Sequence, residues 1–378
     1  MPPVPTGRFA PSPTGPLHVG NLRTAVLAWL FARASGGRFV LRVEDLDRRA
    51  SRQDHERSQL ADLRAVGIDW DGEVVRQSER FDRYEAALDR LDGEGVLYPC
   101  YCSRKEVAAA ASAPHGPLPE GAYPGTCRRL SSAERASREA AGRRPAWRVR
   151  ARGDEVEVVD RRVGRWSTAV DDFVVRRNDG TPAYQIAVVV DDADQGIEEV
   201  VRGQDLLDTT PRQVWLAGRL DLPVPAYLHV PLVVGPDGHR LAKRHGAVTL
   251  SELGASLAGA GAGAGAGAAA DAAGRPSGAA AAGAAGAGAP PDRVGGEASF
   301  RSEGRAMAPT SGARAIANAT VPVVLGAMAA SLGLAAPGQP VASVRALLAR
   351  VDPTRPEAMP PSEWTFEPAD LLLRAAVT

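Results

Sequence analysis

Lysine is almost absent from this chain. Of its 45 basic residues only Lys105 and Lys243 are lysines, so either one suggests a site that needs a compact, flexible ammonium group. Net charge is also absent, with 45 basic against 45 acidic residues, so overall charge indicates no particular partner. No uncharged apolar run approaches about 18 residues, and the amino-terminal residues lack the apolar core of a signal peptide. We therefore expect a cytoplasmic protein without a membrane span.

Cysteine is scarce too: the chain has three, Cys100, Cys102 and Cys127. An odd, clustered set in a chain without an export signal favours a metal site over disulfides. Three thiolates suit Zn²⁺, whose fourth position needs nitrogen, oxygen or sulfur. His115 and Tyr123 both lie between the second and third cysteines, and His115 is the more common type of ligand. The competing interpretation is three reduced core cysteines that bind no metal.

The stretch from Arg8 to Asn21 contains three prolines and two glycines and precedes apolar residues at helical spacing. Such a turn offers the backbone N–H groups and the positive dipole of a helix start, which suit a phosphate. We expect His18 and Asn21 to add side-chain donors there. Gly20 should let a flat ring lie against the backbone. The alternative is a proline-rich turn that only starts a helix.

Strands and helices alternate in the first hundred residues. An apolar strand at 38–43 ends in Glu44 and Asp45, and carboxylates at that end of a parallel strand face the ligand crevice of an open sheet. The pattern predicts an α/β fold with a doubly wound parallel sheet, whose first half spans residues 1–97. The pattern resumes at 191–253, where a last strand, 227–234, leads into the glycine-containing loop that carries Lys243.

Residues 98–190 interrupt this alternation and predict an inserted α+β module that carries the cysteines. Short strands are expected at 147–151, 155–159, 172–176 and 184–190. The stretch from Arg128 to Arg152 has nine arginines. It is a candidate contact for a phosphate backbone or, equally, a solvated helix face.

Alanine and glycine make up almost all of residues 258–291. They bury no core, so we expect disorder within an insertion at 254–315. Order should return in a short helical carboxyl-terminal region, 316–378, with helices at 321–334 and 341–373. Trp364 and Phe366 are expected to anchor this region by packing.

Several sequence motifs carry a family resemblance. His18-Val-Gly-Asn and Arg240-Leu-Ala-Lys-Arg resemble the two signatures of class I aminoacyl-tRNA synthetases, the second with Arg240 for a lysine and Ala242 for a serine. Five more are similar to the glutamyl branch of that class: Arg8-Phe-Ala-Pro-Ser-Pro-Thr-Gly, Val43-Glu-Asp, Arg76-Gln-Ser-Glu-Arg, Tyr184-Gln-Ile-Ala-Val-Val-Val-Asp-Asp and Val201-Arg-Gly-Gln-Asp-Leu-Leu. The resemblance covers residues 6–253 and implies the Rossmann-like catalytic sheet of that class.

Activation of glutamate by ATP, with Mg²⁺ accompanying the nucleotide, is the reaction that this resemblance implies. His18, Gly20, Asn21 and Lys243 would bind ATP. Of these, His18, Asn21 and Lys243 would be catalytic, with the ammonium group of Lys243 at the charge that develops on phosphorus. Catalysis would rest on positioning and charge rather than on a protein nucleophile.

The resemblance also implies the residues that hold glutamate. Arg8 and Arg202 would bind carboxylates, because guanidinium groups suit them in bidentate fashion. Glu44 would bind the ammonium group, and Tyr184 and Ser12 would give neutral hydrogen bonds. Which arginine meets which carboxylate stays open.

One family within the branch fits best, the glutamyl-Q tRNA(Asp) synthetases, which join glutamate to the queuosine base in the anticodon of tRNA(Asp). The spacing of Cys100, Cys102, Tyr123 and Cys127 is similar to the zinc site of that family, which implies Tyr123 over His115 as the fourth ligand of one structural Zn²⁺. The residues after Lys243 also leave little room for a glutamyl-type anticodon-binding region. We expect tRNA(Asp) bearing queuosine as partner, and a monomer.

Three alternatives stay open. The first is a truncated but true glutamyl-tRNA synthetase that charges the 3′ end of tRNA(Glu). The second is a zinc-bearing RNA-binding module with an inactive nucleotide site. The third, an adenylyltransferase of the same superfamily acting on a small acid, leaves the cysteines and the arginine-rich stretch without a purpose.

Overall fold

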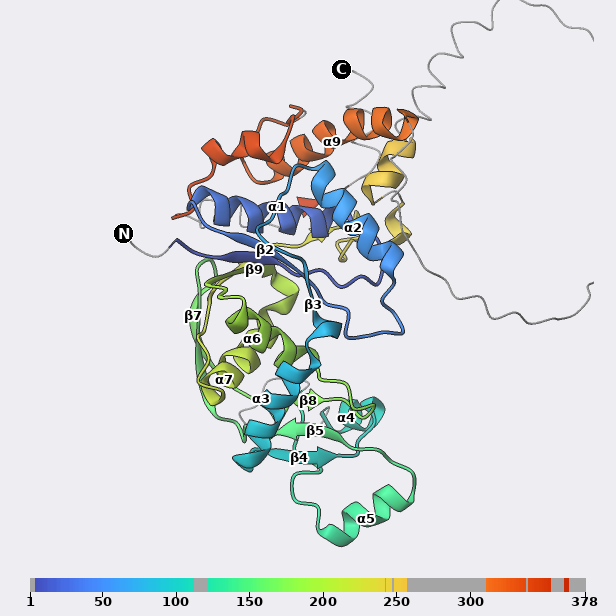
Figure 1. Cartoon of the computed structure of the whole chain (residues 1–378), viewed down its shortest axis with the longest axis vertical. Helices are drawn as coiled ribbons and strands as arrows, with labels where there is room; N and C mark the ends of the chain where they lie inside the picture. The colour runs from blue at the N-terminus through green and yellow to red at the C-terminus, as the bar shows by residue number, and fades with distance from the viewer. Residues whose placement is uncertain are drawn as a thin grey trace, which may run out of the picture.

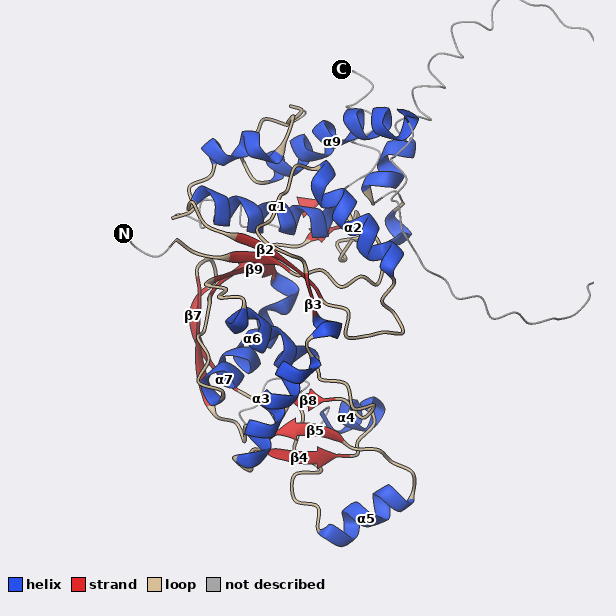
Figure 2. Cartoon of the chain, in the orientation of Figure 1, coloured by secondary structure: helices blue, strands red, loops and turns tan. Residues whose placement is uncertain are grey.

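A parallel sheet forms the centre of the molecule in the computed structural model, which describes residues 4–111, 122–241, 243–246, 248–256, 311–337, 339–354 and 364–366. Its strand order is β3-β2-β1-β9-β10-β6-β7, and every neighbouring pair is parallel except the β6–β7 hairpin. The strands are β1 Gly7–Phe9, β2 Phe39–Val43, β3 Val75–Arg76, β6 Glu155–Asp160, β7 Gly164–Ala169, β9 Glu199–Gly203 and β10 Ala226–Val230. The predicted doubly wound sheet is confirmed (Figure 2).

Helices cover both faces of this sheet (Figure 1). One face carries α1 Val19–Ala34 and α2 Gln53–Ala65, and the other carries α3 Phe81–Gly93, α6 Tyr184–Asp194 and α7 Thr210–Arg219. Most of α1 is buried, because α9 Ser311–Ser331 and the 3-10 helix η4 Val344–Arg350 pack over its outer side. None of the described helices is long and apolar enough to cross a membrane.

A smaller antiparallel sheet, with the order β4-β5-β8, lies in the lower lobe of Figure 1. Its strands are β4 Leu97–Cys100, β5 Ala146–Val149 and β8 Val174–Arg176, accompanied by α4 Arg104–Ala111 and α5 Ser132–Ala140. Between β5 and β8 the chain returns to the central sheet, where β6 pairs with β10. The strand predicted at 155–159 therefore extends the central sheet.

The strand predicted at 184–190 is wrong, because these residues begin helix α6. The apolar run from Ile186 to Val190 is buried throughout. Burial on all sides removes the polar positions that mark an amphipathic helix, and β-branched residues cost a helix only tenths of a kcal/mol each. Tertiary packing therefore overrides the local preference for a strand.

The carboxyl-terminal region is also less helical than predicted. α9 covers residues 321–331 of the helix expected at 321–334, and it begins at Ser311, inside the insertion predicted to be disordered at 254–315. The described part of 341–373 contains η4 and a short strand, β12 Trp364–Thr365. β12 pairs in parallel with β11 Val233–Val234, directly after β10. Trp364 and Phe366 pack against the core that includes α1, as predicted. The Ala/Gly-rich residues at 258–291 lie outside the described residues.

Candidate active site and cysteine cluster

A cavity of about 520 Å³ opens at the carboxyl ends of β1 and β9. From β1 the chain continues to one side of the sheet, through β2 and β3, whereas β9 leads to β10 on the other side, so this is a topological switch point where open α/β sheets bind ligands. Among the described side chains, the cavity brings together the residues predicted for glutamate and ATP: Arg8, Ser12, His18, Gly20, Asn21, Glu44, Tyr184 and Arg202.

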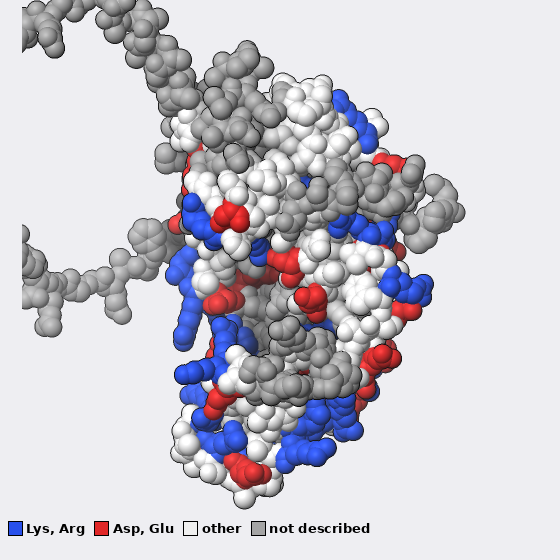
Figure 3. All heavy atoms as spheres, turned by 180° about the vertical axis from the view of Figure 1, so that it is seen from behind, with Lys and Arg blue, Asp and Glu red and all other residues white. Residues whose placement is uncertain are grey.

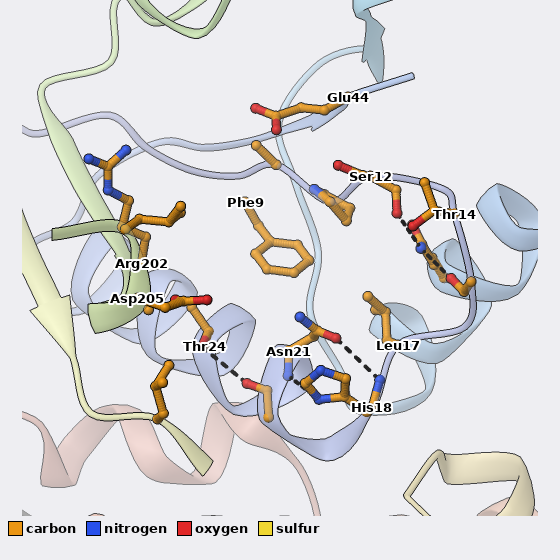
Figure 4. Close-up of a pocket in the computed structure, with 18 of the residues that line it drawn as sticks. Phe9, Ser12, Thr14, Leu17, His18, Asn21, Thr24, Glu44, Arg202 and Asp205 are labelled. Atoms are coloured by element: carbon orange, nitrogen blue, oxygen red, sulfur yellow. Dashed lines mark hydrogen bonds between the residues drawn. The ribbon is translucent and has the colours of Figure 1, made fainter. Parts of the chain in front are cut away.

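Figure 4 shows two ends of this cavity, with Phe9 between them. Glu44, which follows β2, and Arg202, which belongs to β9, lie at one end. His18 and Asn21 lie at the other end, at the start of α1. A ligand with one polar group at each end would therefore span the junction between the sheet and the helix.

His18 forms the amino-terminal cap of α1. Its Nδ1 accepts a hydrogen bond from the Asn21 backbone at 3.2 Å, and the Asn21 side chain accepts one from the His18 backbone at 3.4 Å. Burial lowers the pKa of His18 to about 4, helped by the charge of Arg240, so the ring is neutral. Since Nδ1 accepts, Nε2 carries the proton and acts as a donor.

The phosphate-binding hypothesis for this helix start is changed by that cap. The backbone N–H of Val19 already donates to Val248, and that of Asn21 donates to His18. These two backbone N–H groups were expected to be donors to a phosphate, but they donate to other groups of the protein instead. The His18 Nε2–H and the Asn21 amide take their place as the donors available to a ligand.

Gly20 makes room for the His18 ring. A Cβ atom at Gly20 would lie 2.9 Å from Cε1 of that ring and 3.3 Å from Cβ of Val233. Any larger residue would therefore displace the imidazole. In this structure the flat ring that lies against Gly20 is the imidazole of His18, and a role of Gly20 toward ATP stays a prediction.

The loop after β11 closes the same end of the cavity. Arg240 lines the cavity and pairs with Asp205 at 2.6 Å. Lys243 begins a short 3-10 helix, η3 Lys243–His245, but its side chain lies outside the described part of the structure. Within this loop the side chain of Asp237 pairs with those of Arg244 and His245.

Glu44 lies in a buried network of charges. Its side chain is 9% exposed, and burial raises its pKa although the guanidinium groups of Arg42 and Arg8 act in the opposite direction. Burial destabilises the ionised form of this carboxylate, and a cationic ligand would offset that cost. Arg8 donates from Nε to Asp192 at 3.4 Å, and none of the described residues accepts from its terminal nitrogens. This end of the cavity suits a zwitterion.

Arg202 is a buried cation held by neutral groups. Its Nε donates to His229 at 3.0 Å, and its terminal nitrogens donate to Gln213 and Thr210, each at 2.8 Å. Burial lowers the pKa of Arg202, and no carboxylate of the described residues forms an ion pair with it. Three of its five N–H groups are used, so two remain for an anionic ligand.

Sequence reasoning missed the residues that support these side chains. Arg42 is fully buried and contacts Asp192 at 2.7 Å, Gln195 at 2.8 Å and Glu44 at 3.3 Å. A signal was present, because an arginine inside the apolar strand Phe39–Val43 of a sheet covered on both faces must find partners. His229, on β10, gave a similar signal.

The three cysteines form a compact cluster in the lower lobe. Their sulfur atoms all lie within 4.8 Å of one another, so the cluster could hold a metal such as zinc. The Tyr123 hydroxyl lies 3.4 Å from Cys100 Sγ and 3.7 Å from Cys102 Sγ, and Cys102 and Cys127 are 3.5 Å apart. Zn–S and Zn–O bonds of about 2.3 and 2.0 Å around a tetrahedral ion place ligand atoms roughly 3.5–3.8 Å apart, so the donors fit Zn²⁺. His115 lies outside the described residues.

A basic cleft of about 1160 Å³ adjoins this cluster. Its described lining residues include five arginines and no acidic residue: Arg104, Arg143, Arg144, Arg148 and Arg177. Arg148 also lies over the Tyr123 ring, at 3.8 Å from its centre. Figure 3 shows basic side chains on this lobe from the side opposite to Figure 1. Ala183 lines the cleft and Tyr184 lines the smaller cavity, so consecutive residues at the start of α6 border the two openings.

Comparison with known proteins agrees with this arrangement. Residues 4–255 match the family model for the catalytic domain of class I tRNA synthetases (E and Q). A glutamyl-Q tRNA(Asp) synthetase of Nocardia farcinica is 64% identical over 65% of this chain and 78% of its own length. That of Symbiobacterium thermophilum is 55% identical over 66% of this chain and 81% of its own length. The structure of a glutamate tRNA ligase from Elizabethkingia meningosepticum superposes with a TM-score of 0.67 at 22% identity, over 98% of this chain and 68% of that one, and shows the same fold.

Proposed function

This chain belongs to the glutamyl-Q tRNA(Asp) synthetases, a ligase family within class I tRNA synthetases, and we propose that it activates glutamate with ATP and transfers it to queuosine in tRNA(Asp). The observation that carries the proposal is the cavity in which Glu44, Arg8 and Arg202 lie opposite the donors of His18 and Asn21. Its charges complement glutamate, which has two carboxylates and one ammonium group. We propose that the reaction takes place in the cytoplasm, where ATP and tRNA are available.

In the first step, an oxygen of the glutamate α-carboxylate attacks the α-phosphorus of ATP. The bond from that phosphorus to the bridging oxygen breaks, giving glutamyl-adenylate and pyrophosphate. Neutral His18 donates from Nε2 and Asn21 from its amide, both at the helix start where the positive end of the α1 dipole adds to the attraction for phosphate. The ammonium group of Lys243 would stabilise the negative charge that develops on the phosphates, and Mg²⁺ would accompany the ATP.

Glutamate is held by the other end of the cavity. Glu44 binds the ammonium group, Arg8 and Arg202 bind carboxylates, and Tyr184 and Ser12 give neutral hydrogen bonds. Both arginines are buried, so their attraction for a carboxylate is screened less than at a surface. The groups are held before substrate arrives, which favours catalysis by positioning.

In the second step, a nucleophilic group of the queuosine base attacks the acyl carbon of glutamyl-adenylate and releases AMP. The basic cleft of the lower lobe supports this step, because its arginines suit RNA phosphates. Ala183 of the cleft and Tyr184 of the cavity are consecutive residues at the start of α6. A nucleoside bound from that side would reach the activated carboxylate.

The metal-binding part of the proposal assigns one structural Zn²⁺ to Cys100, Cys102, Tyr123 and Cys127. Bound zinc would tie β4 to the segment around Cys127 and so fix the wall of the basic cleft. The Tyr123 hydroxyl accepts a hydrogen bond from the Cys127 backbone at 2.8 Å, which holds its oxygen toward the sulfur atoms. No catalytic step involves this metal.

The decisive experiment is glutamate-dependent ATP–pyrophosphate exchange without tRNA, followed by transfer of labelled glutamate. We expect exchange without any tRNA, and transfer only to tRNA(Asp) that contains queuosine. Charging of tRNA(Glu), or exchange that needs it, would instead support a true glutamyl-tRNA synthetase. Absence of exchange under all conditions would support an RNA-binding module with an inactive nucleotide site. Transfer that ignores queuosine would refute the proposed acceptor.

A further inference from the structure

Two fully buried residues, His229 and Asp160, lie behind Arg202 and touch no open surface of the cavity. They come from different strands: His229 stands on β10 and is the register partner of Arg202 on β9, while Asp160 ends β6. Neither residue belongs to a motif of the resemblance. A buried carboxylate and a buried imidazole in contact need an explanation, because burying polar groups costs free energy unless they are well paired.

The contacts form a chain from Asp160 through His229 to Arg202. Asp160 Oδ2 accepts from both the backbone N and Nδ1 of His229, at 2.9 and 2.8 Å. Nε2 of the same ring lies 3.0 Å from Nε of Arg202. Asp160 Oδ1 is held in turn by the backbone N–H groups of Arg162 and Val163. Each side chain is therefore held by the next: Arg202 by His229, His229 by Asp160, and Asp160 by backbone N–H groups.

The proton positions follow from these contacts. Asp160 can only accept, so Nδ1 of His229 carries the hydrogen, and Nε2 is left as an acceptor. Arg202 can only donate, so Nε2 must stay unprotonated for the contact to exist. Burial lowers the pKa of His229 in spite of the opposing effect of Asp160, and Arg202 lowers it further, which keeps the ring neutral. The Thr210 hydroxyl, also near Nε2, can donate its hydrogen to Leu206.

We propose that His229, oriented by Asp160, is a positioning residue that aims Arg202 at a glutamate carboxylate without neutralising it. This inference rests on the proposed function. The imidazole accepts the hydrogen bond from Nε–H of Arg202, which leaves N–H groups on both terminal nitrogens for a bidentate contact with the ligand. A carboxylate in direct contact would compete with the substrate for the same cation. The intervening neutral ring holds the guanidinium in place while its charge stays available.

Two substitutions of nearly equal size separate this role from simple packing. In His229→Gln, the side-chain oxygen reaches the position of Nε2 and can accept from Arg202, but the donor to Asp160 is lost. In His229→Asn, the shorter amide reaches the position of Nδ1 and can donate to Asp160, but nothing accepts from Arg202. Both variants bury an amide in the same site. Each variant keeps one of the two side-chain contacts of His229: His229→Gln keeps the contact with Arg202, and His229→Asn keeps the contact with Asp160.

The measurement is the KM for glutamate and for ATP in pyrophosphate exchange without tRNA. In His229→Asn we expect the KM for glutamate to rise about 10-fold to 100-fold, as for loss of one hydrogen bond from a charged donor. In His229→Gln it should rise less than about threefold. The KM for ATP should change less than about twofold in both, because His18 and Asn21 lie at the other end of the cavity. Thermal unfolding monitors the fold.

The outcomes separate this inference from the proposed function. Absence of glutamate-dependent exchange in the unsubstituted chain would refute the proposed function. Normal exchange in that chain, with His229→Gln as impaired as His229→Asn or unable to fold, would refute the positioning role. Equal rises in the KM for glutamate and for ATP would also refute it, because a general structural defect affects both ends of the cavity.

Discussion

Replacing Arg42 with methionine should destabilise the protein more than any surface charge substitution. Arg42 is fully buried and lies 2.7 Å from Asp192, 3.3 Å from Glu44 and 3.7 Å from Asp191. Methionine fills similar space, so the cavity left behind is small. The loss comes instead from buried carboxylates that lose their cationic partner. Removing one member of a buried ion pair costs about 3–5 kcal/mol.

The effect should depend on pH in a defined direction. In the unsubstituted chain, burial acts to raise the pKa of Asp192, but Arg42 and Arg8 overcome this and hold it below its ordinary value. This ion pair therefore adds stability above the ordinary pKa, and the gain is lost as the pH falls through the lowered pKa. Without Arg42, burial favours the protonated acid. The difference in stability should thus be larger at pH 8 than at pH 3.

Urea unfolding of the unsubstituted chain, Arg42→Met and Arg76→Met tests this reasoning at both pH values. Arg76 also contacts a carboxylate, that of Glu56 at 2.7 Å, but its side chain is 36% exposed. We expect its substitution to cost at most about 1 kcal/mol. An Arg42→Met variant that loses no more stability than Arg76→Met, or a difference that grows toward pH 3, would refute the argument.

Three further predictions concern the nucleotide end and the cysteine cluster. His18→Asn keeps a capping oxygen but removes the titrating ring, whose pKa is lowered to about 4 from 6.5. As the pH falls from 6.5 to 4, the unsubstituted chain loses of order 3 kcal/mol of stability through this residue. Urea unfolding of His18→Asn should not show this loss, and pyrophosphate exchange by the variant should fall at least about tenfold. Gly20→Ala should displace the His18 ring and lower exchange by about tenfold, whereas unchanged kinetics would show that the ring can move without cost. Cys127→Ser should abolish stoichiometric zinc in metal analysis, and Tyr123→Phe should weaken zinc binding at least about tenfold. If Tyr123→Phe keeps its full zinc content and His115→Ala loses it, the fourth ligand is His115 instead.

The sheet and the cavity could be predicted because their signals are local. Prolines and glycines before an apolar helical pattern predicted the start of α1, and His18 with Asn21 forms its cap. Glu44 follows directly on a buried strand, and all parallel strands of such a sheet end at one edge. A short stretch of sequence therefore contains both the residue and the element that positions it.

The supporting contacts could not be predicted, because they join residues far apart in the sequence. Asp160 and His229 are 69 residues apart, and Arg42 and Asp192 are 150 apart. Asp160 lies on a strand that sequence reasoning placed in the inserted module, since nothing local shows that β6 returns to the central sheet. For α6 the failure was different: uniform burial erased the helical period. Long-range pairing, not local preference, decided these features.

The pairing of β12 with β11 has a consequence for how this chain tolerates change in length. Trp364 and Phe366 donate backbone hydrogen bonds to Leu232 and Val234, and Leu232 lines the candidate active site. For a flexible connection, doubling the length costs only about 0.6 kcal/mol, so we expect insertion or removal of residues in the Ala/Gly-rich stretch to change the stability of the fold little. A slip of one residue in β12, in contrast, turns Trp364 and Phe366 away from the core. We therefore expect the number of residues before this strand to matter little for stability, whereas the register of the strand is fixed by the core into which Trp364 and Phe366 pack.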